Sequence, residues 1–226
     1  MSASLATRTV AQMLAFVAIV GAITFVPAGT VDYCTGWLWL AIFVAASIAI
    51  TIYLYRRDPA LLERRLALAQ SGEPTAAQKL AQAGAAIAFF GMIAAAGLDH
   101  RWELTRVPGA LVATGAALVI AGFAIVFEVF RENTFTSSVV AVERDQRVID
   151  SGLYARVRHP MYGGGLVLIF GSPLALGSLV ALAACPVLAL VIVLRARDEE
   201  RMLARDLPGY AEYLQRVRWR FVPFIA

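Results

Sequence analysis

The chain has 226 residues, of which 60% are hydrophobic and only 16% are charged. A soluble domain usually carries about 25% charged residues, so this composition excludes an ordinary soluble domain and indicates an integral membrane protein. The formal net charge of +4 does not indicate a nucleic-acid partner, because the basic residues lie between apolar segments. In that arrangement they suit the anionic inner face of a membrane.

The few cysteines and histidines argue against a metal-binding protein and against a disulfide-stabilised one. Cys34 and Cys185 lie far apart, and the two histidines are His100 and His159. Neither pair has the spacing of metal ligands or of a disulfide framework. We therefore expect no metal site.

Apolar runs divide the chain into candidate membrane spans. Four runs cover approximately residues 10–26, 36–55, 80–98 and 108–130. The first could also be a secretory signal peptide, but no clear small-x-small cleavage site precedes the next segment. The final apolar region, 160–194, is too long for one span, and each half would cover about 25 Å of a hydrocarbon core of about 30 Å.

The turn-forming residues at 171–173 and 177–178 predict a tight hairpin within this last region. The sequence therefore predicts an all-α integral membrane protein with about six transmembrane helices, the last two forming a short hairpin. We treat residues 1–226 as a single membrane domain, in which residues 1–130 form the N-terminal spans and residues 131–226 carry the motifs.

The connecting segments give further expectations. Residues 59–69 could form a short surface helix whose leucines face lipid. The polar segment 131–158 is interpreted as a structured loop, with a short hairpin near residues 145–146. The last span is expected to continue to about Arg205, and residues 210–220 form an amphipathic tail rich in basic and aromatic residues.

The distribution of basic residues predicts the orientation. With a cytoplasmic N-terminus, the outer loops of the six-span layout hold only Arg101 and Arg106, and all other basic residues lie inside. Such asymmetry predicts that both termini are cytoplasmic. It also places segments 128–162 and 195–226 on the same face, where they can build one site.

Three groups of polar residues meet at that face. The first is the stretch Ser151 to Gly165, read as SGLYARVRHPMYGGG. The second is the charged segment 195–201, which includes the adjacent Glu199 and Glu200. The third comprises Glu128, Glu132 and Asn133, at the end of the fourth run. Polar rings and charges near a bilayer are costly unless they bind something or line a wet cavity.

Each group also has a simpler interpretation. The glycines at 163–165 could be a helix-packing face, and the tyrosines could be interfacial anchors. The segment 195–201 could be a solvated helix end with Arg195 and Glu199 as surface neighbours. Glu128 could be an interfacial carboxylate paired with Arg131.

The run Arg158-His159-Pro160-Met161-Tyr162-Gly163-Gly164 resembles the RHPxYxG signature of the isoprenylcysteine carboxyl methyltransferase and phospholipid methyltransferase superfamily. Residues 133–135, 198–203, 208–213 and 221–223 are similar to other parts of that pattern. The resemblance covers about residues 131–223, and its ordered parts make it specific. The first hundred residues match only as generic spans.

This resemblance implies a membrane methyltransferase that uses S-adenosylmethionine, held without a Rossmann fold between the last helices and a cytoplasmic C-terminal segment. It implies a lipophilic substrate, surrounding membrane lipids as partners, and an active site at the cytoplasmic face. The implied cofactor-binding residues are Tyr154, His159, Pro160, Tyr162, Gly163, Gly164, Glu199 and Glu200. Beside these, the residues at this face that we expect to be catalytic are Asn133, Arg218 and Glu128.

The methyl acceptor stays open. For a carboxylate acceptor, Arg218 or Arg220 could orient the substrate together with Asn133, and no base is needed. For an amine, as in a phospholipid N-methyltransferase, Glu128 or Glu132 could act as a base. The alternatives are an NADPH-dependent membrane reductase with a similar His-Pro-x-Tyr element, and a non-catalytic scaffold.

Overall fold

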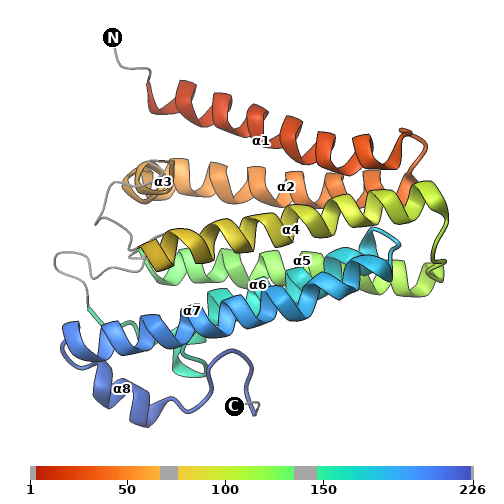
Figure 1. Ribbon diagram of the computed structural model, residues 1–226. Helices are drawn as coiled ribbons and strands as arrows, with labels where there is room; N and C mark the ends of the chain where they lie inside the picture. The colour runs from red at the N-terminus through yellow and green to blue at the C-terminus, as the bar shows by residue number, and fades with distance from the viewer. Residues whose placement is uncertain (1–3, 67–75, 135–146, 225–226) are drawn as a thin grey trace.

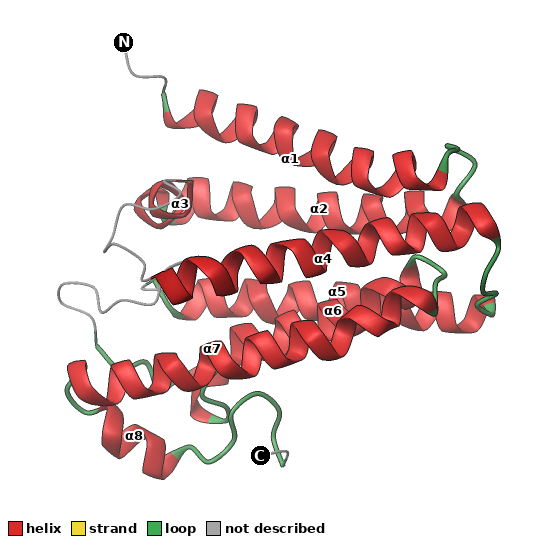
Figure 2. Cartoon of the chain, in the orientation of Figure 1, coloured by secondary structure: helices red, strands yellow, loops and turns green. Residues whose placement is uncertain are grey.

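A computed structural model describes residues 4–66, 76–134 and 147–224. Within these ranges the chain is helical and contains no β-strand (Figures 1 and 2). The predicted hairpin near residues 145–146 lies outside the described residues. The elements are α1 (Leu5–Ala28), α2 (Cys34–Arg57), α3 (Pro59–Leu66), α4 (Ala76–Trp102), α5 (Gly109–Glu132), η1 (Gly152–Ala155), α6 (Pro160–Ala175), η2 (Val180–Ala184), α7 (Cys185–Asp206) and α8 (Tyr210–Arg216).

Five of the described helices are long and apolar enough to cross a membrane. They are α1, α2, Ala83–Trp102 of α4, α5, and the continuous segment Val180–Asp206. The sixth apolar helix, α6, has 16 residues, which at about 1.5 Å per residue is shorter than a hydrocarbon core of about 30 Å. The all-helical architecture is thus confirmed, with five candidate spans and one shorter apolar helix.

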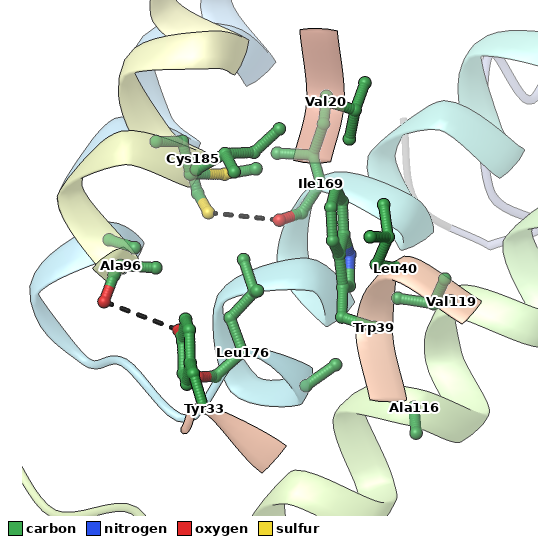
Figure 3. Close-up of a cluster of buried hydrophobic side chains, with 14 of the residues drawn as sticks. Val20, Tyr33, Trp39, Leu40, Ala96, Ala116, Val119, Ile169, Leu176 and Cys185 are labelled. Carbon is green, nitrogen blue, oxygen red and sulfur yellow. Dashed lines mark hydrogen bonds between the residues drawn. The ribbon is translucent and has the colours of Figure 1, made fainter. Parts of the chain in front are cut away.

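The turn between α6 and α7 lies later than predicted. Ser172 and Pro173 are inside α6, which ends at Ala175. Pro173 has no amide hydrogen for the carbonyl four residues earlier, that of Ile169. The Cys185 thiol donates to this carbonyl over 3.4 Å (Figure 3), so the carbonyl keeps a partner where the helix continues through the proline.

Tertiary contacts with α2 and α4 hold that turn in place. The Tyr33 hydroxyl donates to the carbonyl oxygen of Leu176 over 2.7 Å, and the Thr35 hydroxyl donates to the same atom over 2.8 Å. Figure 3 shows Tyr33 beside Leu176. The Asp99 carboxylate, near the end of α4, accepts from the hydroxyls of Ser178 and Thr105. These buried polar contacts fix the end of the bundle opposite to α3 and α8.

Glycines let α5 and α6 pack closely. A Cβ on Gly122 of α5 would lie 2.8 Å from the carbonyl oxygen of Gly164, and one on Gly115 would lie 2.3 Å from the Ala175 nitrogen. From the α6 side, a Cβ on Gly171 would lie 3.0 Å from the Gly115 carbonyl oxygen. This packing places the start of α6 beside the end of α5.

The leucines of α3 do not face lipid, which corrects the sequence-based expectation. Leu61 and Leu62 are buried in a cluster with Leu54 and Phe130. The Asp58 carboxylate accepts from the Leu61 amide over 2.9 Å, and this cap turns the chain sharply after α2. The helix therefore lies inward, against the ends of α2 and α5.

One end of the bundle gathers the segments that carry the motifs. Figure 1 shows α3, the end of α7 and α8 at this end, at the left of the view. The N-terminal end of α1 lies there too. The start of α6 joins the end of α7 through the contact between Tyr162 and Glu199. The tail after α8 runs back beneath α7 as a loop (Figure 2).

Candidate active site

The C-terminal tail pairs with the segment that enters α6. Val157 and Trp219 form an isolated parallel bridge. The Arg158 amide donates to the Trp219 carbonyl over 2.9 Å, and the His159 amide donates to the Arg220 carbonyl over 2.8 Å. Further along the tail, the Phe221 carbonyl oxygen would lie 2.6 Å from a Cβ on Gly163. Only glycine at this position allows the tail to lie directly on the first turn of α6.

A buried carboxylate joins α7 to both of these segments. Glu200 is 8% exposed. Its Oε1 lies 3.0 Å from Arg158 Nε and 3.2 Å from His159 Nε2, and Arg220 Nη2 donates to its Oε2 over 2.9 Å. A buried carboxylate is stable only when it is paired and hydrogen-bonded, and Glu200 has these partners on two other segments.

The neighbouring Glu199 has different partners. The Tyr162 hydroxyl donates to Glu199 Oε2 over 2.6 Å and accepts from Arg195 Nε over 2.9 Å. Successive residues of a helix point about 100° apart, which sends the two glutamates to different sides of α7. Glu199, Tyr162 and Arg195 are all only partly buried, so this group can be reached by a ligand.

A second polar pair lies between α5 and η1. Asn133 Nδ2 donates to the Tyr154 hydroxyl over 3.0 Å. Burial raises the pKa of Tyr154 to about 12, and the charge of Glu199 adds to this effect. The hydroxyl therefore stays protonated at neutral pH. The Tyr213 hydroxyl of α8 donates to the Tyr154 carbonyl over 2.8 Å, which anchors η1 to α8.

Other predicted residues lie apart from these contacts. Glu128 forms a 2.9 Å ion pair with Arg131 on the exposed side of α5. This is the pairing expected if Glu128 is an interfacial carboxylate. Glu132 accepts a hydrogen bond from the Ser151 hydroxyl. Arg218 lines a groove on the tail and has no contact with Glu200, whereas Arg220 does.

The predicted glycines contact protein backbone. Gly163 faces Phe221, and a Cβ on Gly164 would lie 3.0 Å from the carbonyl oxygen of Gly122 in α5. Pro160 occupies the first turn of α6, where its fixed φ favours helix initiation. Close packing thus accounts for these three residues.

Sequence reasoning gave no site role to Arg195 or Tyr213. The i,i+4 spacing of Arg195 and Glu199 suggested a surface pair, but Tyr162 lies between the two side chains. The partner of Tyr213 is a carbonyl 59 residues earlier in the chain, and no local pattern indicates it. The described residues contain no group of three or more His, Cys, Asp or Glu side chains that could hold a metal ion.

Residues 110–208 match the family model described as phospholipid methyltransferase. The superfamily resemblance is confirmed. This region includes Asn133, Tyr154, Tyr162 and Glu199, and it ends before the tail. The chain is thus similar to membrane methyltransferases over the segment that builds the polar cluster.

Comparison with solved structures extends the similarity in fold to almost the whole chain. The eukaryotic intramembrane Ras methyltransferase, isoprenylcysteine carboxyl methyltransferase, matches with a TM-score of 0.60 at 19% sequence identity. The match covers 96% of this chain and 77% of that one. The spans before residue 110 therefore follow the same arrangement.

A curated relative has another activity. The Delta(14)-sterol reductase of Mus musculus is 32% identical over 104 residues, which are 42% of this chain. The matched segment is 25% of the reductase, so the chain spans about a quarter of that relative's length.

Proposed function

We propose that this protein is an integral membrane methyltransferase that uses S-adenosylmethionine to methylate a lipophilic acceptor, most like the isoprenylcysteine carboxyl type. The observation that carries the proposal is the partly buried Glu199–Tyr162–Arg195 group at the end of an apolar bundle, inside the region that matches the family model. The distribution of arginines supports a cytoplasmic position for this end of the bundle.

The residues present suit this cofactor. A sulfonium and an α-amino group are cationic, and a carboxylate favours them where water is scarce. Tyr162 occupies one oxygen of Glu199, and no described residue donates to the other. Glu200 is already balanced by Arg158, His159 and Arg220. We therefore assign Glu199 to the cofactor and Glu200 to the structure that surrounds it.

The bound cofactor would supply a methyl carbon already activated by its sulfonium. The protein's task is then to position the acceptor and exclude water. A carboxylate acceptor is ionised at neutral pH, so no residue must remove a proton. Asn133 and the protonated Tyr154 offer neutral hydrogen-bonding groups within reach of the charges of Glu199 and Glu132. We assign Asn133 to the acceptor side of the site.

Calorimetry on the full chain in detergent tests cofactor binding. The folded protein should bind S-adenosylmethionine, and Glu199→Gln should weaken binding at least about tenfold, the effect of one lost charge-assisted contact. Glu128→Gln is the matched control, because Glu128 pairs with Arg131 away from the cluster, and it should bind as the parent does. Absence of binding to the intact, folded protein would overturn the proposal.

The acceptor requires a second experiment. Labelled methyl transfer should be measured into a membrane lipid extract and into a prenylcysteine analogue. A base-labile ester product is expected, because the fold matches a carboxyl methyltransferase. A base-stable amine product would instead assign the protein to the phospholipid N-methyltransferases.

A reductase is the second candidate, because of the 32% identity with the sterol reductase. That class requires NADPH. Retention of NADPH instead of S-adenosylmethionine by the purified protein would reverse the assignment.

A further inference from the structure

A groove lined by the C-terminal tail is separate from the Glu199–Tyr162–Arg195 group. Its cavity has a volume of about 480 Å³. It lies between η1 and the segment that follows α8. The residues that line it include Arg156, Arg216, Arg218, Trp219, Pro223 and Phe224.

Of the three arginines at this groove, one has a carboxylate partner among the described residues. Arg216 forms an ion pair with Asp150. Within the described part of the chain, neither Arg156 nor Arg218 has a carboxylate oxygen within 4.0 Å. Two arginines at one cavity therefore present guanidinium groups that can bind an anion at two points.

The groove also presents apolar rings. Phe224 is 85% exposed, and its ring lies 5.7 Å from that of Trp219, centroid to centroid. Val222, between them in the chain, is also exposed. Exposed rings next to arginines are typical of the interface between lipid headgroups and acyl chains.

The tail lies beside the start of α6, which agrees with a position at the lipid headgroups. Phe221 contacts Gly163, in the first turn of α6. The apolar residues of α6 follow immediately, so the tail lies at the level where an apolar helix enters the bilayer. Phospholipid phosphates are found at this level.

We propose that this groove binds the phosphate of an anionic membrane phospholipid, with Arg156 and Arg218 on the phosphate and Trp219 and Phe224 against the upper acyl chain. The tail also carries Arg220, which pairs with Glu200, so a lipid in the groove would hold the tail on the site. The lipid site requires only that the bundle spans the membrane. It does not depend on the methyltransferase assignment.

Native mass spectrometry of the full chain in detergent tests this, with phosphatidylglycerol and phosphatidylcholine as probes. The protein should retain phosphatidylglycerol preferentially. Arg156→Gln and Arg218→Gln should each weaken that retention about tenfold, as expected for one lost charge-assisted contact. Both side chains are exposed, so the variants should keep the parent's melting temperature.

Matched controls separate the groove from general charge effects. Arg197 is exposed on α7 and likewise has no ion-pair partner among the described residues. Arg197→Gln should leave lipid retention unchanged. Phe224→Ala should weaken phosphatidylglycerol retention without altering the unfolding temperature.

Three outcomes would overturn the proposal. One is equal retention of phosphatidylcholine by the parent protein. Another is an equal loss of retention in Arg197→Gln. The third is binding of inorganic phosphate as tightly as phosphatidylglycerol, because a free anion would gain nothing from the two rings.

Discussion

At the scale of single residues, two adjacent glutamates have different surroundings. Glu200 is enclosed by Arg158, His159 and Arg220, which come from the start of α6 and from the tail. Glu199 contacts Tyr162 through one oxygen, and none of the described residues donates to the other. The difference follows from the rotation of about 100° between successive helical residues. Substitutions at the two positions should therefore have different consequences.

We expect Glu200→Gln to destabilise the protein. Removing one partner of a buried ion pair typically costs about 3–5 kcal/mol, because the remaining charges lose their counter-ion. Arg158 and Arg220 are 14% and 23% exposed, so we expect the lower end of that range. Thermal unfolding in detergent should show a lowered midpoint for Glu200→Gln and an unchanged midpoint for Glu199→Gln. Equal midpoints for the two variants would contradict the assignment of Glu200 to structure.

At the scale of elements, the site depends on how α3, α5 and α6 are placed. Arg64 of α3 donates to the carbonyl of Thr134 over 2.7 Å, and the Arg65 guanidinium lies 4.7 Å from the centre of the Phe130 ring. These contacts hold the end of α5, which carries Asn133. The glycines of α5 and α6 then set the distance between the two helices.

The inward position of α3 can be tested at Leu61. This side chain is fully buried, so Leu61→Ala should cost about 2–5 kcal/mol and lower the unfolding midpoint. Ile87 of α4, which is 73% exposed, is the matched control. Ile87→Ala should leave the midpoint nearly unchanged. If Leu61 instead faced lipid, the two variants would behave alike.

The α5–α6 contact can be tested at Gly122. Its Cβ would lie 2.6 Å from Leu168 Cγ and 2.8 Å from the Gly164 carbonyl oxygen, so Gly122→Ala forces the helices apart. Overpacking of this kind costs about 1–3 kcal/mol. Gly91→Ala is the control, because a Cβ there has open space. The unfolding midpoint should be lowered only in Gly122→Ala. S-adenosylmethionine affinity should fall with it, because α6 carries Tyr162, the hydrogen-bond partner of Glu199.

At the scale of the whole molecule, the spans place α8, the tail and the start of α1 toward one end (Figure 1). Cys34 begins α2 at the opposite end and is exposed, whereas Cys185 is buried. The chain thus contains one accessible native thiol among the described residues, and its position reports the orientation.

The proposed orientation puts Cys34 outside the cell. A membrane-impermeant maleimide should label Cys34 in intact cells. Arg197→Cys, made together with Cys34→Ser, should be labelled only after permeabilisation, because Arg197 lies at the site end of α7. The reverse pattern would place the site on the outer face.

The site could be predicted only in part from sequence. The proximity of segments 128–162 and 195–226 was predicted correctly from the basic residues, and the family motif indicated Tyr162 and Glu199. The motif could not separate the roles of Glu199 and Glu200. Nor could it indicate that Gly163 accommodates the tail, because that contact joins residues far apart in the chain.

The sequence by itself determined that the protein is helical and membrane-embedded, because run length and hydropathy are properties of contiguous residues. Tertiary structure decided the rest. The turn that follows α6 is held by Tyr33 and Thr35 donating to the Leu176 carbonyl, and α3 packs against Leu54 and Phe130. The environment of Glu200 depends on the tail lying against α6. Partners of buried groups are set by the segments that meet in space, and no local pattern encodes that meeting.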